Sequence, residues 1–278
     1  MVAEILGKID HRNVRIEELE AIPALTPASR TYEPYQHGEF ARETAALADS
    51  ILGQYGYHCS GEQYIISKDG SRMFGVRSYG HGARAHSVID YTDSSTQGEL
   101  KMQFAFANST DRSLRAKFGL GAQVMVCSNG IVAGEIVVTR KHTPGLREYL
   151  VENLTGALHK APQEFGELCF AVDRWKRYYL SDQMAHRLLG EWWGQGIISP
   201  AKLGKIKKHW ESDDDFPDKT LWSLYNACTE SFKGLPPNLI FSRHIALHSA
   251  AQVQYSNQGS DGAQVRYSNQ GSDNENHN

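Results

Sequence analysis

Apolar residues recur along the chain with two different periods, which separate a strand-rich part from helical parts. From Gly38 to Tyr55 they follow the three- and four-residue spacing of an amphipathic helix. Residues 57–140 show the short runs and alternation typical of strands, and the helical spacing returns over 145–248. Because the strands cluster and do not alternate with helices, the pattern predicts an α+β fold. We expect a central, mostly antiparallel sheet of hairpins, with helices packed on it from the C-terminal half.

Two turn signals divide the strand-rich part into hairpins. Asp69-Gly70 separates predicted strands at 57–67 and 72–79. Asn129-Gly130, preceded by Ser128, separates predicted strands at 123–127 and 131–138. Both dipeptides favour the tight turns that join antiparallel strands. The other elements predicted in this part are strands at 86–92 and 100–107 and a short helix at 110–117.

The two ends of the chain show neither period. Residues 1–37 contain three prolines and are predicted to form an irregular N-terminal arm. Residues 251–278 contain two nearly identical copies of one Gly-, Ser-, Asn- and Gln-rich repeat. This composition offers too little apolar surface to offset the entropy of chain ordering, so we predict a disordered tail. A single domain over residues 38–250 is left.

Composition limits the class of protein. The 278 residues, 40% of them hydrophobic, are enough for the predicted domain. No run approaches the roughly 18 apolar residues of a membrane span, and the N-terminus has no signal-peptide core. The four cysteines are far apart and form no Cys-x-x-Cys pair, which favours reduced thiols in a cytoplasm. We therefore expect a cytoplasmic protein without a membrane partner.

No motif of a known enzyme class is present. The sequence has no phosphate-binding Gly-x-x-x-x-Gly-Lys-Ser/Thr, no Gly-x-Ser-x-Gly and no His-Glu-x-x-His. His244 and His248 have the i, i+4 spacing of two metal ligands on a helix, but no third ligand accompanies them. An ordinary helix face is the better interpretation of this pair. We expect neither a metal nor another cofactor. The absence of these motifs argues against an enzyme but does not decide whether the protein is one.

Charge is unevenly distributed, although the net charge is only −3. Residues 101–147 carry seven Lys or Arg against two Asp or Glu. If residues 112–117 fold back beside the strand that starts near Gln123, the basic residues on both sides of this hairpin meet at its open end. They would then form a patch that contacts phosphates, with an ordinary solvated surface as the alternative. The candidate nucleic-acid-binding residues are Arg112, Arg115, Lys117, Arg140, Lys141 and Arg147.

A polar pattern in the same region carries a family resemblance. It consists of Asn108, Ser109, Asp111, Ser113, Gly121, Val126, Cys127, Asn129, Gly130, Gly134 and Glu135. These residues also have a structural interpretation, because Asn, Ser and Asp bind turns and helix ends and Asn-Gly tolerates positive φ. The pattern resembles the phage- and plasmid-like proteins that carry the domain of unknown function 932. The resemblance implies an origin on a mobile genetic element and action in a bacterial cytoplasm, and it supplies no catalytic residue.

Three functions are compatible with these patterns. The first is nucleic-acid binding by an accessory protein in phage or plasmid DNA replication or recombination, with single- or double-stranded DNA as the partner. The second is an interaction module that counters or modulates host functions and binds a host or phage protein through Trp192-Trp193. The third is an enzyme acting on nucleic acid or a small molecule through Asp111, Asn129 and Glu135. The charge of residues 101–147 favours the first.

Overall fold

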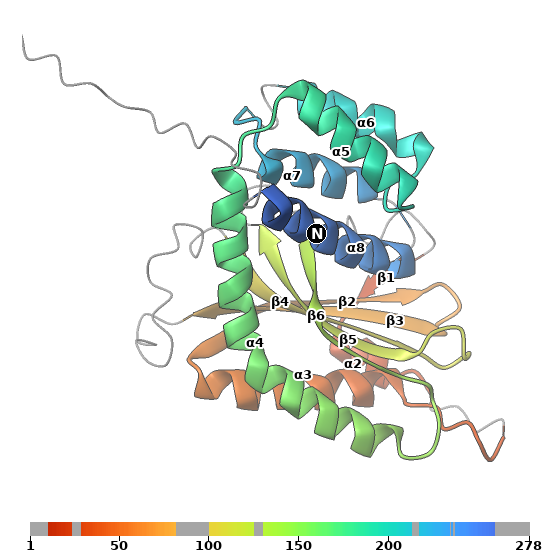
Figure 1. The fold of residues 1–278 in the computed structure, drawn as a ribbon. Coiled ribbons are helices and arrows are strands. Elements are labelled where there is room, and N and C mark those ends of the chain that lie inside the picture. Colours follow the sequence, from red (N-terminus) through yellow and green to blue (C-terminus); the bar gives the residue numbers. More distant parts are fainter. Residues whose placement is uncertain are drawn as a thin grey trace, which may run out of the picture.

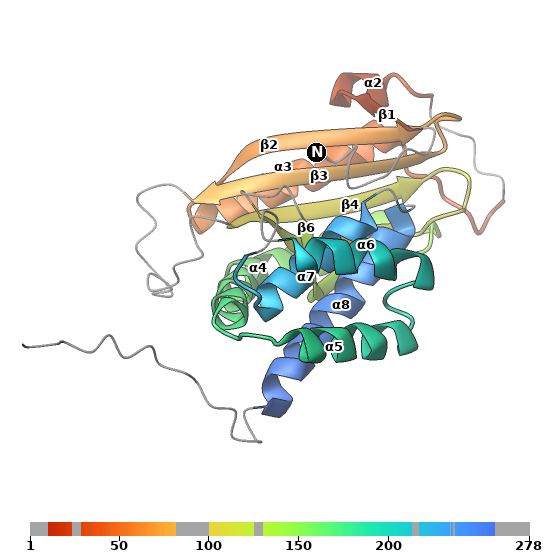
Figure 2. The same cartoon turned by 90° about the horizontal axis from the view of Figure 1, so that it is seen from above.

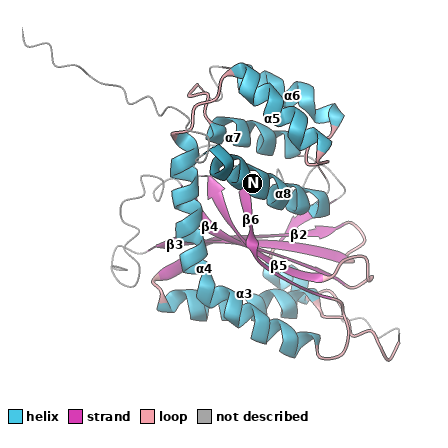
Figure 3. Cartoon of the chain, in the orientation of Figure 1, coloured by secondary structure: helices cyan, strands magenta, loops and turns pink. Residues whose placement is uncertain are grey.

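The computed structural model describes residues 11–23, 29–81, 100–124, 130–212, 217–233, 235 and 237–258. A six-stranded antiparallel sheet has its strands in chain order: β1 (His11–Val14), β2 (Tyr57–Ser67), β3 (Arg72–His81), β4 (Leu100–Ser109), β5 (Ala116–Val124) and β6 (Gly130–Arg140). The helices of the described residues are α2 (Ile16–Glu20), α3 (His37–Gln54), α4 (Leu146–Lys176), α5 (Asp182–Gly194), α6 (Pro200–Glu211), α7 (Leu221–Phe232) and α8 (Pro237–Gln258). The predicted α+β class is confirmed: the strands β2 to β6 follow one another in the described chain, the helices α4 to α8 come after them, and Figure 3 shows the sheet and the helices in separate layers.

The sheet lies between two sets of helices (Figures 1 and 2). On one face, α3 packs Phe40 against the rings of Phe106 and Phe118, with centroids 6.0 and 5.2 Å away. On the other side of the sheet, α8 lies against β6 (Figure 1). The long α4 contacts β6 and extends from the level of α3 to the level of α7 (Figure 1). One continuous hydrophobic core, from Val14 to Ala251, joins sheet and helices.

The two predicted hairpins differ in how closely they match the structure. β2 and β3 pair on either side of Asp69-Gly70, and Gly70 has the positive φ of 74° that this turn requires. β5 and β6 also pair, but Gly130 lies opposite Gln123 within the ladder. The prediction that Gly130 belongs to a tight turn is therefore wrong. The part of β5 that pairs with β6 ends at Gln123, so the connection from Gln123 to Gly130 is longer than a two-residue turn. The predicted strand at 86–92 lies outside the described residues.

The N-terminal arm is not irregular throughout, so the prediction for 1–37 is wrong over 11–20. β1 pairs with β2, with Val14 opposite Tyr64, and α2 buries Leu19 completely. A strand of four residues and a helix of five are too short to show a period in the sequence. β1 is stabilised by pairing with the free edge of β2, and α2 is stabilised by its contacts with α3.

The tail begins as a helix, so the prediction of disorder from residue 251 is wrong over 251–258. α8 continues to Gln258 and buries Ala251 completely. Tyr255 packs edge-on against Tyr178, with ring centroids 6.1 Å apart, and the Arg174 guanidinium lies 5.5 Å from its ring. Two residues of the first repeat copy, four positions apart, thus face the core. The rest of the predicted tail, 259–278, lies outside the described residues.

Truncation after residue 250 should lower the free energy of unfolding by about 1–3 kcal/mol relative to truncation after residue 258. The shorter chain loses an aromatic pair and a cation–π contact, each contributing about 0.5–1.5 kcal/mol, together with the buried Ala251. Urea unfolding of the two chains measures the difference. Equal urea midpoints would show that the packing of Tyr255 contributes nothing to stability.

No helix in the described part of the chain has the length and apolar character needed to cross a membrane.

Candidate anion-binding site

Strand pairing brings together two loops that are distant in sequence. β5 and β6 pair with Ala116 opposite Arg140 and Lys117 opposite Thr139. The residues just before β5 and just after β6 therefore lie at the same open end of the hairpin. This end is where the β4–β5 loop meets the connection from β6 to α4.

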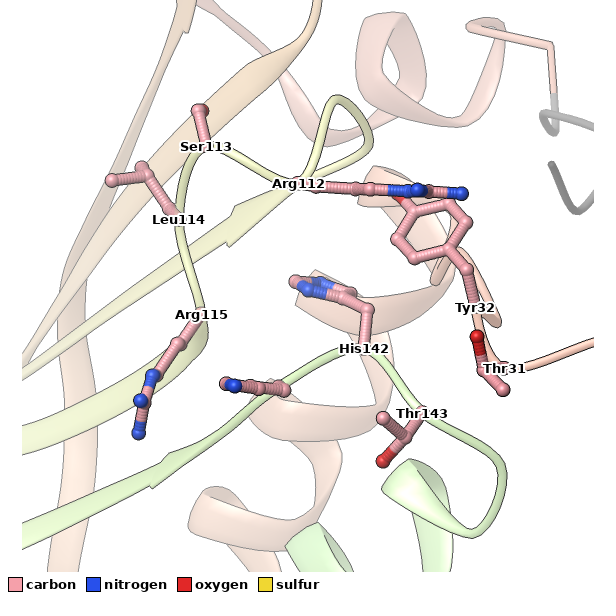
Figure 4. A pocket seen from close by; sticks show the side chains of 9 residues that line it. Thr31, Tyr32, Arg112, Ser113, Leu114, Arg115, His142 and Thr143 are labelled. Atoms are coloured by element: carbon pink, nitrogen blue, oxygen red, sulfur yellow. The ribbon is translucent and has the colours of Figure 1, made fainter. Parts of the chain in front are cut away.

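A surface cleft of about 350 Å³ lies between these loops (Figure 4). Arg112 and Arg115 come from the first loop and Lys141 from the second, and no carboxylate is among the described residues that line it. No ion pair joins any of the three cations to another residue of the described ranges. The positive charges of the cleft are therefore not neutralised by the described residues and can bind an anion. The full lining is Thr31, Tyr32, Arg112, Ser113, Leu114, Arg115, Lys141, His142 and Thr143.

Arg147, a candidate from the sequence, belongs to a different cluster. Its guanidinium pairs with the carboxylates of Glu39 and Glu43 and lies 4.9 Å from the ring centroid of Tyr35. The two glutamates come from the first turns of α3, more than 100 positions before Arg147. Because nearby carboxylates neutralise this cation, it is poorly suited to hold a phosphate.

Arg140 and Lys117 also lie outside the cleft lining. Arg140 stacks on Tyr149 of α4, with its guanidinium carbon 4.4 Å from the ring centroid. Successive residues of a strand point to opposite faces of the sheet. Lys117 is therefore on the face opposite Ala116 and its partner Arg140. Of the six candidate cations, Arg112, Arg115 and Lys141 line the cleft.

Behind the cleft, a buried amide links two histidines. Nδ2 of Asn108 donates to the carbonyl oxygen of Tyr35 (2.8 Å) and to Nδ1 of His37 (3.0 Å). Nε2 of His142 donates to the amide oxygen of Asn108 (2.7 Å). The other nitrogen of His37 lies 3.1 Å from the carbonyl oxygen of Gly70, and since a carbonyl only accepts, this nitrogen carries the proton. The amide thus fixes both imidazoles.

Both histidines are uncharged at neutral pH. Burial, reinforced by the neighbouring His37, lowers the pKa of His142 to about 4. Burial also lowers the pKa of His37, against the opposing effect of its hydrogen bond to Gly70. The charge of the cleft at pH 7 therefore comes from its arginines and lysine, and His142 contributes a neutral polar surface.

The first half of the polar sequence pattern shapes the β4–β5 loop. The Ser109 hydroxyl donates to the carbonyl oxygen of Leu114 (2.9 Å) and accepts from the Leu114 N–H (3.0 Å). The Asp111 carboxylate accepts from the backbone N–H of Ser113 (2.9 Å). Such local side-chain bonds compete with helical hydrogen bonds. The short helix predicted over 110–117 is accordingly absent, and these residues form the loop and the start of β5.

The second half of the pattern is only partly described. Gly121 lies in β5 opposite Gln103, and Gly130, Gly134 and Glu135 lie in β6. Val126, Cys127 and Asn129 are outside the described residues. The structure therefore does not describe how the candidate enzyme residues Asp111, Asn129 and Glu135 lie relative to one another. The Asp111 carboxylate itself is bound by Ser71, Arg72 and Ser113. Burial opposes the ionised form of Asp111, but these contacts outweigh it and lower its pKa.

The remaining candidates are placed in the helical part. Trp192 is buried, whereas Trp193 is 50% exposed. His244 and His248 are both buried, against the rings of Phe232 and Trp175 respectively. Within the described ranges, no three His, Cys, Asp or Glu side chains come together as a metal site.

Sequence reasoning missed two residues of the site, Tyr32 and His37. Tyr32 lines the cleft and donates its hydroxyl to the carbonyl oxygen of Thr110 (2.5 Å). Both residues belong to the arm that was predicted to be irregular. No local pattern marks them, because their partners are about 70–80 positions away and only the fold brings them together.

Comparison with known proteins gives one family match. The sequence profile of the family described as "Domain of unknown function (DUF932)" matches residues 24–255. This range includes every residue that lines the cleft. A comparison with curated proteins and one with solved structures gave no match.

Proposed function

The chain belongs to the DUF932 family, and on that premise we propose that it binds nucleic acid by holding the phosphate backbone in the cleft. One observation carries the proposal: Arg112, Arg115 and Lys141 line one cleft whose described lining contains no carboxylate. Arginine and lysine are the residues that most often contact phosphates in nucleic-acid complexes. Unpaired cations also gain the most from an incoming anion, because no internal ion pair has to be broken.

The cleft's geometry is consistent with an anion site that is built before the ligand arrives. Asn108 holds His142 in place from behind, and the bonds of Ser109 and Asp111 hold the loop that carries two of the cations. Preorganised donors lose little conformational entropy on binding. The protein therefore offers a cationic cleft whose loop backbone and His142 are held in place before a ligand binds.

The wider biological part of the proposal rests on the sequence resemblance. We propose an accessory role in DNA replication or recombination of a phage or plasmid, in the cytoplasm of a bacterial host. The partner in this role is single- or double-stranded DNA.

Salt-titrated binding tests the proposal. Fluorescence anisotropy with a labelled 20-nucleotide strand should show log K falling with log salt at a slope of about −2, or about −2.7 for a duplex, if each of the three cations contacts one phosphate. For the single strand, the affinity should fall about twentyfold between about 50 and 200 mM salt. A protein with no salt-sensitive binding to either probe at about 50 mM salt would show that nucleic-acid binding is wrong.

The alternative is a module that binds a host or phage protein, and one observation favours it. Trp193 of α5 is half exposed beside the buried Trp192, and tryptophan is enriched among residues that dominate binding energy at protein interfaces. This alternative predicts partner binding that is lost in Trp193→Ser and insensitive to changes in the cleft.

A further inference from the structure

One wall of the cleft contains a cation–π pair of a guanidinium and an aromatic ring. The guanidinium carbon of Arg112 lies 4.4 Å from the ring centroid of Tyr32, and Figure 4 shows the arginine extended across the ring. Tyr32 is 8% exposed, and its hydroxyl is anchored to the carbonyl oxygen of Thr110. Burial raises the pKa of Tyr32, so the phenol stays protonated and keeps this hydrogen bond. Arg112 itself is exposed, so its side chain is accessible to a ligand.

The backbone of Arg112 is held in an unusual conformation. Its φ of 67° lies in the left-handed region, which is unfavourable for a residue with a side chain. The loop imposes this conformation through the Ser109–Leu114 bonds and the Asp111–Ser113 bond on either side. Strain of this kind persists where the surroundings over-determine it and is common at binding sites. Here it accompanies the placement of a guanidinium plane over a fixed aromatic ring.

The other cations lie apart from the pair of Arg112 and Tyr32. Arg115 is on the opposite side of His142 from Arg112 and Tyr32 (Figure 4). Lys141 lines the same cleft from the β6–α4 connection. The cleft therefore offers an exposed guanidinium at one end, backed by the ring of Tyr32, and further positive charge beyond a neutral imidazole. A nucleotide has a matching division between a flat base and a charged phosphate.

The volume of the cleft limits what can enter. About 350 Å³ is at the lower end of the range for small-ligand pockets. Such a space suits one nucleotide unit and is far too small for a duplex. The base of that unit can reach the guanidinium plane only when it is unstacked from its neighbours, as bases in single strands are. Arginine planes and aromatic rings are the usual platforms for such bases.

We propose that the cleft binds one unpaired nucleotide of a single strand, with the base stacked on the outer face of Arg112 and the phosphate held by Arg115 and Lys141. This inference rests on the proposed function and names its ligand class. Arg112 then acts through its planar shape as well as its charge, whereas Arg115 acts through charge. An exchange of each arginine for lysine separates the two roles, because lysine keeps the charge and loses the plane.

The test uses the full-length protein at about 50 mM salt and three labelled probes: a 12-nucleotide thymidine strand, the same strand without bases, and a 12-base-pair duplex. The wild-type protein should bind the thymidine strand about 5- to 150-fold more tightly than the abasic strand, the range that stacking of one base provides. It should also prefer the thymidine strand to the duplex. A 12-nucleotide uridine strand distinguishes DNA from RNA as the source of the nucleotide.

Arg112→Lys should bind the thymidine and abasic strands equally, and Arg115→Lys, the matched control, should keep the wild-type preference. Thermal unfolding confirms that both variants are folded. This inference would be overturned if the wild-type protein bound the thymidine and abasic strands equally, or if Arg112→Lys kept the full preference for the thymidine strand. The proposed function would still stand in either case if binding depended on salt. Absence of salt-dependent binding to every probe would overturn both.

Discussion

Replacement of Asn108 by alanine should lower the free energy of unfolding by about 3–5 kcal/mol. The side chain is fully buried and makes three hydrogen bonds, to Tyr35, His37 and His142. Alanine would leave a carbonyl and two imidazole nitrogens without these partners, and each unsatisfied buried group costs about 1–3 kcal/mol. Urea or thermal unfolding at pH 7 measures the loss.

Asn153→Ala is the matched control for this prediction. Asn153 is half-buried in α4 and donates to the carbonyl oxygen of Tyr149 one turn earlier (2.8 Å). Its loss should cost less than about 1 kcal/mol, because water can replace the partner. If Asn108→Ala unfolds at the same urea concentration as Asn153→Ala, the buried amide does not organise the floor of the cleft.

Acid should destabilise the protein strongly between pH 6.5 and about pH 4. Burial lowers the pKa of both His244 and His142 from 6.5 to about 4. In this interval the unfolded chain binds more protons than the folded chain, so the stability is complete above pH 6.5 and falls as the pH decreases. The two histidines together should remove about 3–5 kcal/mol by about pH 4.5. Urea unfolding at a series of pH values measures the loss.

His244→Leu should remove about half of this pH dependence. In the described structure, Nδ1 of His244 is buried without a hydrogen-bond partner, and the ring packs edge-on against Phe232 at 5.6 Å. Leucine fills a similar apolar space and cannot take up a proton, so the variant should exceed the wild-type protein in stability at pH 5. His186→Leu, at an exposed position of α5, is the control. An unchanged pH profile in His244→Leu would contradict the role assigned to this histidine.

The parts of the fold that could be predicted are those specified by local chemistry. Asp69-Gly70 marked the β2–β3 hairpin because the turn needs a left-handed glycine, and Gly70 has that φ. Longer-range packing could not be predicted in the same way. Ala251 and Tyr255 belong to a repeat whose composition is typical of disorder, yet Ala251 is buried and Tyr255 contacts Arg174 of α4 and Tyr178 just after it, which keeps this segment in α8.

The candidate site also combines features that the local sequence specifies with features that only tertiary contacts decide. Basic residues on the two sides of the hairpin could be recognised from the charge pattern, since antiparallel pairing places them at one end. Which of them carry free charge depends on tertiary contacts: Arg147 is paired with glutamates of α3, whereas Arg112 is not paired within the described residues. Tyr32 gave no signal, because its role follows from contact with a loop about 80 positions later.

The position of the phosphate site is tested most directly by removal of its three cations together. Glutamine at positions 112, 115 and 141 removes the charges and retains polar side chains of moderate length. The slope of log K against log salt for the single strand should fall in magnitude by about 0.7 for each phosphate contact that is lost, which is about 0.7 for one phosphate and about 2 if each cation contacts its own phosphate. Folding should be retained, because exposed charges seldom contribute more than about 1 kcal/mol each.

The matched control removes the same amount of charge from the exposed face of α6, at Lys205, Lys207 and Lys208. We expect its salt slope to equal that of the wild-type protein. Anisotropy titrations from about 50 to 200 mM salt should separate the two triple variants in this way. A wild-type slope in the cleft variant, with a reduced slope in the α6 variant, would contradict the cleft as the phosphate site.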